Sequence, residues 1–279
     1  MTKKVVFQGE LGAYSHQACI NYLTKQEIAE FDIIPKPTFE QAFKAVESGF
    51  AELAVIPIEN SKAGRVTDVH NLLENTDLKI IDELFLPVKH NLWGIEGSDI
   101  KDVTSALSHP QALMQTDEFL TTYNIKPQNF HDTAGACLHI KELNDKSLAG
   151  IGSKTAGELY DLELLAENIA DDPNNTTRFV IFSRKDVHDP IKENCLTSIL
   201  FEVKNKPAAL YNLLDIFAKE SINIIRLESY MNNGSFKNST FYAELDCNAA
   251  KQLENSQNKL EELTSKFKII GIYPKDDFR

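Results

Sequence analysis

The chain has 279 residues, of which 42% are apolar and 25% are charged, and this is the composition of a soluble globular protein with room for two domains. Its formal net charge of −12 argues against nucleic acid and anionic membranes as main partners, because both are bound by clustered Lys and Arg. The apolar run at the N-terminus is too short for a signal peptide, and no stretch approaches the ~20 apolar residues of a membrane span, so we expect a cytoplasmic protein.

The first two thirds of the chain alternate between two hydrophobic patterns. Apolar runs typical of strands lie at residues 5–7, 31–35, 53–58, 80–88, 91–94, 103–107, 147–151 and 178–183. Helical patterns lie between them at residues 15–24, 38–48, 66–73, 110–121, 153–160 and in a helix that starts with Asp132 as its cap. Strands that alternate with helices predict an α/β fold with mainly parallel sheets.

The pattern changes after a charged segment at residues 185–194, which contains Pro190 and which we interpret as a linker. Strands are then predicted at 197–203, 222–231, 239–246 and 267–272, helices at 208–219 and 249–265, and a turn at 232–235. The resulting order βαββαβ is the ferredoxin-like arrangement. By analogy of fold, a small domain of this kind after a larger one is expected to sense a small molecule.

Polar side chains follow the strand predicted at 53–58. Glu59, Asn60 and Ser61 place an acid, an amide and a hydroxyl at one rim of the predicted sheet. In open α/β sheets, ligands bind beyond the carboxyl ends of the strands. These residues therefore indicate a binding site, although a polar turn or a helix cap explains the same pattern.

Ser108 precedes the helix predicted at 110–121 and is its expected N-cap, and Gln115 lies within that helix. Seven positions are close to two helical turns, so both side chains should point to one side. A hydroxyl and an amide on one face suit recognition of a carboxylate or a hydroxyl. A capping residue followed by a solvated helix face is the alternative.

Arg178 stands at the mouth of the apolar strand predicted at 178–183, after the polar run at 174–177. A guanidinium group binds carboxylates bidentately, so Arg178 is a candidate for a substrate carboxylate. The alternative is a structural Arg that pairs with one of the protein's own acids.

No metal site or disulfide framework is indicated. The seven histidines lack metal-binding spacing such as H-E-x-x-H, and the four cysteines are far apart in the sequence. The cysteines are Cys19, Cys137, Cys195 and Cys247.

Taken together and in order, residues 57–61, 108–115, 132–134 and 177–179, followed by the βαββαβ tail, resemble the prephenate dehydratases that carry a C-terminal ACT regulatory domain. The resemblance extends over nearly the whole chain, from Phe7 to Ile272. It implies conversion of prephenate to phenylpyruvate, with loss of carbon dioxide and water, in phenylalanine biosynthesis. This is a hydro-lyase reaction, and the resemblance implies no cofactor and no metal.

The same resemblance implies a domain organisation. Residues 1–185 would form a catalytic domain like a periplasmic binding protein, with two α/β lobes and the active site between them. The first lobe would comprise 1–75 and 174–185, and the second 76–173. Residues 196–274 would form the ACT domain.

The resemblance also assigns roles to single residues. It places Thr177 against the leaving hydroxyl, and we hypothesise that Glu59 or water supplies the proton, since two substrate carboxylates would raise the pKa of Glu59. It places the remaining site residues around the substrate. They are Asn60, Ser61, Ser108, Gln115, Thr133, Arg178 and Phe179.

Two segments of the tail, 206–210 and 227–231, resemble the phenylalanine-binding motifs of ACT domains. Ala208 stands where the motif usually has Gly, and Tyr230 and Met231 stand where it usually has Arg and Pro. Binding between paired ACT domains would require a homodimer or a homotetramer. The resemblance implies effector contacts at Ala208, Ala209, Leu210, Asn223, Glu228 and Ser229.

Two further interpretations remain. An arogenate dehydratase would make phenylalanine directly and would bind an amino group where prephenate has a ketone. The second is a two-lobed ligand-binding regulator that has the fold but no catalytic activity. The presence of Thr177, Arg178 and Phe179 argues against this interpretation. A transport-type binding protein would need an export signal, which we do not find.

Overall fold

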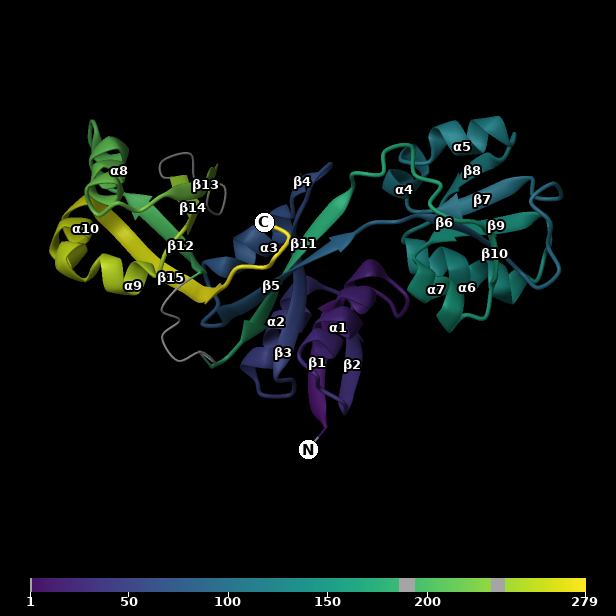
Figure 1. Ribbon diagram of the computed structural model, residues 1–279, viewed down its shortest axis with the longest axis horizontal. Helices are drawn as coiled ribbons and strands as arrows, with labels where there is room; N and C mark the ends of the chain where they lie inside the picture. Colours follow the sequence, from purple (N-terminus) through teal and green to yellow (C-terminus); the bar gives the residue numbers. More distant parts are fainter. Residues whose placement is uncertain (1, 186–193, 232–238) are drawn as a thin grey trace.

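The computed structural model describes residues 2–185, 194–231 and 239–279, which form three bodies in a row (Figure 1). Two α/β lobes occupy the centre and one end, and a C-terminal domain occupies the other end. Within the described ranges, no helix is long and apolar enough to cross a membrane. The predicted turn at 232–235 and most of the predicted linker at 185–194 lie outside the described residues.

Lobe 1, in the centre, is built on one sheet with the strand order β2-β1-β3-β11-β5, and β4 pairs with β3. Strands β1, β2 and β3 are parallel, whereas β11 is antiparallel to both β3 and β5. The elements are β1 (Lys3–Gln8), α1 (Tyr14–Lys25), β2 (Phe31–Lys36), α2 (Phe39–Glu47), β3 (Leu53–Asn60), β4 (Gly64–Arg65), α3 (Thr67–Leu73), β5 (Lys79–Pro87) and β11 (Thr176–Ser183).

Lobe 2 is built on a second sheet with the order β10-β6-β9-β7-β8. Strand β7 is parallel to β8 and β9, and β6 is antiparallel to β9 and β10. The elements are β6 (Asn91–Gly94), β7 (Ser105–Ser108), α4 (Pro110–Met114), α5 (Asp117–Thr122), β8 (Lys126–Asn129), α6 (Thr133–Leu143), β9 (Leu148–Gly152), α7 (Lys154–Leu159) and β10 (Glu163–Ala166).

The predicted α/β class is confirmed, but both sheets are mixed rather than mainly parallel. The chain leaves lobe 1 after β5 and returns into β11, so two neighbouring strands of that sheet run in opposite directions. Strand β5 therefore belongs to lobe 1, although residues 76–87 were predicted in lobe 2. The two segments that connect the lobes, one after β5 and one before β11, are called the crossover segments below. The backbone N–H of Val88 in the first donates to the carbonyl of Asn175 in the second at 2.8 Å.

Three elements of lobe 2 differ from the prediction. The helix predicted at 110–121 is two helices, α4 and α5, because the hydroxyl of Thr116 bonds the carbonyls of Ala112 and Leu113 and ends the first one. Strands β8 and β10 were not predicted, because their side chains are mostly exposed and lack an apolar alternation.

The C-terminal domain has the predicted βαββαβ order, in an antiparallel sheet with the strand order β13-β14-β12-β15. The second helix, predicted as one element at 249–265, is divided into three short pieces. The elements are β12 (Cys195–Val203), α8 (Ala209–Lys219), β13 (Ile224–Met231), β14 (Ser239–Leu245), α9 (Ala249–Gln252), the 3-10 helix η1 (Glu254–Ser256), α10 (Gln257–Leu263) and β15 (Thr264–Pro274).

The C-terminal domain shares its core with lobe 1. Leu200, Tyr242 and Ile270 belong to one apolar cluster together with Ile80 and Phe182 of lobe 1. Strand β15 also lies against β5, where a Cβ on Gly271 would fall 2.1 Å from the carbonyl oxygen of Ile80. Only glycine permits this close approach, so the two sheets are packed directly on each other.

Candidate active site

A cavity of about 340 Å³ lies where lobe 1, lobe 2 and the two crossover segments meet. Asn60 and Thr177 line it from the ends of β3 and β11, and Gln115 and Thr133 line it from lobe 2. Each of these four side chains was predicted as a site residue, and the structure brings them together in one space. Within the described ranges, no three His, Cys, Asp or Glu side chains are grouped closely enough to hold a metal ion.

The side-chain amide of Asn60 fixes the direction of the Thr177 hydroxyl. Its Oδ1 accepts hydrogen bonds from the backbone N–H groups of Lys62 at 2.9 Å and Ala63 at 2.8 Å. Its Nδ2 must therefore face the other way, where it donates to Oγ1 of Thr177 at 2.9 Å. Among the described residues, no group accepts a hydrogen bond from this hydroxyl, so its proton is available to a ligand in the cavity.

A chain of hydrogen bonds continues from Asn60 along the floor of the cavity. Nδ2 of Asn60 donates to Oδ1 of Asn175 at 2.7 Å, and Nδ2 of Asn175 donates to Oε1 of Gln115 at 3.1 Å. Nε2 of His90 lies 2.9 Å from the same Gln115 oxygen, and Nδ1 of His90 lies 2.8 Å from the hydroxyl of Tyr14. These hydrogen bonds thus connect both lobes through both crossover segments.

His90 is buried, and burial lowers its pKa, so the ring is neutral near pH 7. Because the carboxamide oxygen of Gln115 can only accept, Nε2 of His90 carries the hydrogen and Nδ1 is an acceptor. The single hydroxyl hydrogen of Tyr14 is shared between this Nδ1 and the carbonyl of Lys89, which lies 2.9 Å from the hydroxyl. Within the described part of the chain, the Gln115 NH2 group makes no hydrogen bond, so it is free to bind a ligand.

Sequence reasoning missed Tyr14, His90 and Asn175, all of which line the cavity. Asn175 belongs to the polar run before β11, which was the available signal. His90 lies three residues after the end of β5, much as Asn60 lies at the end of β3. Tyr14 begins α1, and only the packing of α1 against the crossover brings it to the site.

Five predicted site residues lie outside the cavity, and three of them have structural roles within the lobes. The hydroxyl of Ser61 donates to the carbonyl of Asn174 and accepts from the N–H of Thr176, so it holds the second crossover. Ser108 is buried and donates to the carbonyl of Ile151 at 2.7 Å, and His109 rather than Ser108 caps α4. Phe179 is packed in the core of lobe 1.

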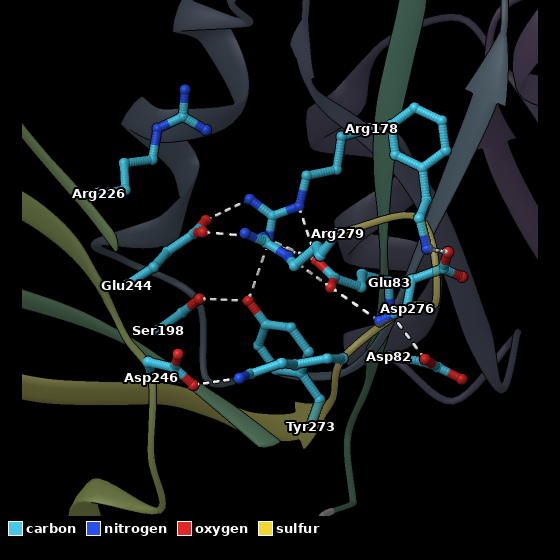
Figure 2. Close-up of polar contacts among 12 residues, drawn as sticks. Asp82, Glu83, Arg178, Ser198, Arg226, Glu244, Asp246, Tyr273, Asp276 and Arg279 are labelled. Atoms are coloured by element: carbon cyan, nitrogen blue, oxygen red, sulfur yellow. Dashed lines mark hydrogen bonds and ion pairs between the residues drawn. The ribbon is translucent and has the colours of Figure 1, made fainter. Parts of the chain in front are cut away.

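Arg178 also points away from the cavity, into a buried ion cluster (Figure 2). It pairs with Glu83 on β5 and Glu244 on β14, and it donates to the hydroxyl of Tyr273 at 3.1 Å. Arg279 completes the cluster by pairing with both glutamates. The role predicted for Arg178, binding a substrate carboxylate, is contradicted by this position, because its donors are already used inside the protein.

Charges within the cluster compensate one another. Burial raises the pKa of Glu244, but Arg178 and Arg279 outweigh this and hold its pKa below the ordinary value. Burial opposes the charge of Arg178, yet its acidic neighbours keep the pKa above the usual range. Two guanidinium groups thus face two carboxylates at the junction of lobe 1 and the C-terminal domain.

Glu59 lies on the same side of the sheet as Arg178, because the two residues are opposite each other in the β3–β11 register. Its carboxylate forms a bidentate ion pair with Arg226 on β13. It does not line the cavity. The structure therefore contradicts the hypothesis that Glu59 supplies the proton.

The predicted effector residues lie at two places in the C-terminal domain. Ala208, Ala209 and Leu210 form the start of α8, and Ala208 adopts the left-handed backbone conformation at φ 61°. Asn223 precedes β13, its carbonyl accepting from the N–H of Asp246 at 2.9 Å. Glu228 and Ser229 lie on β13 and contact Arg65 of lobe 1.

Comparison with known proteins identifies the family. The prephenate dehydratase family model matches residues 5–187. The chain is 38% identical, over 99% of its length and 97% of the relative's, to a bifunctional N-acyl-homoserine lactone acylase/prephenate dehydratase of Komagataeibacter europaeus. It is 35% identical, over 98% of its length and 72% of the relative's, to the chloroplastic arogenate dehydratase/prephenate dehydratase 1 of Arabidopsis thaliana.

Solved structures share the whole fold. One, described as GqqA, a quorum quenching acylase, is 38% identical with a TM-score of 0.89, over 99% of this chain and all of that chain. A prephenate dehydratase of Arthrobacter aurescens, solved in complex with L-Phe, is 24% identical with a TM-score of 0.88, over 99% of this chain and 91% of that one. The chain belongs to the prephenate dehydratase family.

Proposed function

We propose that this protein converts prephenate to phenylpyruvate in the cavity between its lobes, with Thr177 as hydrogen-bond donor to the leaving hydroxyl. The observation that carries this proposal is the orientation of Asn60, which occupies the Thr177 oxygen as an acceptor and leaves the hydroxyl proton for the substrate. A cavity of about 340 Å³ suits a single-ring metabolite.

The reaction needs positioning more than it needs a nucleophile. The bond between the ring and its carboxyl group breaks, the electron pair moves through the ring, and the bond to the 4-hydroxyl breaks. Carbon dioxide and hydroxide leave, and one proton converts hydroxide to water. The new aromatic ring supplies the driving force, so the enzyme must align the departing groups and stabilise the charge on the leaving oxygen.

Thr177 supplies the hydrogen bond, and a solvent water protonates the leaving hydroxide while its own hydroxide passes to bulk solvent. A threonine hydroxyl is too weak an acid to lose its proton outright near pH 7. Glu59 is held by Arg226 on the other side of the sheet, which removes it as the source. The free NH2 group of Gln115 and the hydroxyl of Thr133 are suited to bind the oxygens of the substrate.

The assay is the appearance of phenylpyruvate from prephenate, followed by its absorbance in base. Turnover by the wild-type protein is expected. A wild-type protein that forms no product from either prephenate or arogenate would contradict the proposal.

Two relatives favour parallel assays. The Arabidopsis thaliana relative is named for arogenate as well as prephenate, so phenylalanine formation from arogenate should be measured at the same enzyme concentration. The Komagataeibacter europaeus relative is also named as an N-acyl-homoserine lactone acylase. Release of the fatty acid from such a lactone is the matching test.

We further propose that the C-terminal domain is an ACT domain that binds phenylalanine within a cytoplasmic homodimer or homotetramer. The ferredoxin-like strand order and the two motifs at 206–210 and 227–231 support this. Isothermal titration with phenylalanine, combined with light scattering for the mass of the assembly, tests both parts. A monomer that gives no heat with phenylalanine would contradict them.

A further inference from the structure

Folding brings two of the cysteines together, although all of them are far apart in the sequence. Strands β12 and β14 are antiparallel, with Thr197 opposite Leu245. Two positions further along, the same register places Cys195, the first residue of β12, opposite Cys247, which follows the end of β14. Residues opposite each other in antiparallel strands have Cα atoms about 4.5–5.5 Å apart, within the range of about 4.4–6.8 Å that a disulfide spans.

The segment after β14 stays beside β12 beyond the last paired residues of the ladder. The hydroxyl of Thr197 donates to the carbonyl of Cys247 at 2.6 Å and accepts from the backbone N–H of Ala249 at 3.0 Å. These bonds hold the backbone of Cys247 against the strand that begins with Cys195. The two cysteines are therefore kept near each other by the fold itself.

Both cysteine side chains lie on the helix-covered face of the C-terminal sheet. Cys247 packs against the apolar cluster that contains Ile199 and Ala243. Side chains alternate between the faces of a strand, so Cys195, four positions before Ile199, points to the same face. Cys195 is buried and Cys247 is half-buried, so a dissolved oxidant would reach Cys247 first.

The surroundings of the pair do not stabilise a thiolate. Burial, the Cys195 thiol and Asp246 raise the pKa of Cys247 to about 12. Burial also raises the pKa of Cys195, against the opposing charge of Lys275, which itself pairs with Asp246. Thiol exchange is therefore slow near pH 7, but the reduced form gains no stability from its thiolates that a disulfide would have to overcome.

We propose that Cys195 and Cys247 form a disulfide when the protein meets a low-molecular-weight disulfide such as oxidised glutathione, and that this bond fastens the start of β12 to the chain that leaves β14. The inference goes beyond the proposed function and does not depend on it, because neither cysteine lines the active-site cavity.

The reaction is two successive thiol–disulfide exchanges. The thiolate of Cys247 attacks the S–S bond of oxidised glutathione, which forms a mixed disulfide and releases one glutathione thiolate. The thiolate of Cys195 then attacks the Cys247 sulfur and releases the second. The released thiolates take up the two protons that the cysteines gave to solvent, so two protein thiols are oxidised and one glutathione disulfide is reduced to two thiols.

The first test counts thiols. Wild-type protein is incubated with oxidised glutathione, quenched, unfolded, alkylated and weighed intact. Four labels are expected before oxidation and two after it, with Cys195 and Cys247 in one cross-linked peptide pair. Cys19→Ala, which removes a buried cysteine of lobe 1, is the matched control and should also lose two labels on oxidation. Cys195→Ala should leave Cys247 as a thiol or a glutathione adduct. Four labels on the oxidised wild type, or a bond between any other pair, would overturn the proposal.

The second test measures the fastening. A bond between these positions restricts the unfolded chain, so the urea midpoint of the oxidised wild type should exceed that of the reduced protein by on the order of 0.5 M or more. Cys247→Ala should have the same midpoint under both conditions. An oxidised wild type that contains the bond but has an unchanged or lower midpoint would refute the fastening role.

Discussion

At the scale of single residues, the Thr177 hydroxyl owes its direction to one neighbouring amide. Thr177→Val keeps the shape of the side chain and removes the donor. We expect kcat to fall on the order of 10²-fold or more, with a smaller change in KM, because the hydrogen bond strengthens as charge develops on the leaving oxygen. Thr177→Ser is the control and should retain most of the rate. Initial rates of phenylpyruvate formation measure both, and a fully active valine variant would exclude the role.

His90 acts on the site through Gln115, whose oxygen it holds with its Nε2 hydrogen. His90→Leu removes that donor, so the Gln115 amide can rotate and KM should rise several-fold. His90→Gln places an amide near the former Nε2 position and should restore part of the affinity. His139, which is half-buried and lies away from the cavity, serves as the control when changed to Leu. Equal KM values for the wild type and both His90 variants would contradict this role.

Ala208 has a left-handed backbone conformation, with φ 61°, at the start of α8. This conformation costs an alanine about 1–2 kcal/mol, whereas glycine adopts it freely but loses more chain entropy on folding. Ala208→Gly is therefore expected to increase the free energy of unfolding by about 0.5–1 kcal/mol. Urea denaturation measures it, and a destabilised glycine variant would contradict the strain argument.

At the scale of elements, β3 and β11 explain which site residues could be predicted from the sequence. Successive side chains of a strand point to opposite faces, so adjacent motif residues cannot all reach one cavity. Thr177 and Asn60 face the cavity, while their neighbours Arg178 and Glu59 face the C-terminal domain. A sequence motif identifies the strand, but it does not identify which face receives the substrate.

The ion cluster behind β11 leads to a prediction for stability. Arg178→Leu would leave Glu83 and Glu244 with one cation, Arg279, in a buried position, where Arg178 is 3% exposed. Removing one partner of such a group costs about 3–5 kcal/mol. Chemical denaturation should show a loss of this size, whereas Arg184→Leu, at an exposed position, should change stability by at most about 0.5 kcal/mol. Equal effects of the two variants would contradict the assigned importance of the cluster.

At the scale of the whole molecule, the arrangement of the lobes depends on the two places where the chain passes from one lobe to the other. Local sequence patterns do not predict these two connections. The α/β class and the βαββαβ tail were predictable because both depend on local periodicity. The mixed sheets were not, because the direction of β11 depends on where the chain returns after residue 173. The cavity-lining role of Tyr14 was hidden for the same reason, since it depends on contacts 75 residues away along the chain.

Stability should also depend on pH through Glu244. Its folded-state pKa lies below the ordinary value of 4.5, so its contribution is fully present above that pH and is lost as pH falls through the folded-state pKa. The urea midpoint of the wild type should therefore decline below about pH 4.5. Glu244→Gln should have a lower midpoint at pH 7 and a flatter decline in acid. Parallel acid profiles for the two proteins would contradict the assignment.

The close contact between Gly271 and the Ile80 carbonyl has a consequence for the modularity of the protein. A domain that meets its neighbour through a flexible tether can be removed by proteolysis or lost in evolution without harm to the remainder. Here the apolar surface of lobe 1 beneath Ile80 and Phe182 is covered by the C-terminal domain. Deleting that domain would expose part of an interior, so the two units are expected to unfold as one cooperative block and to be inherited together.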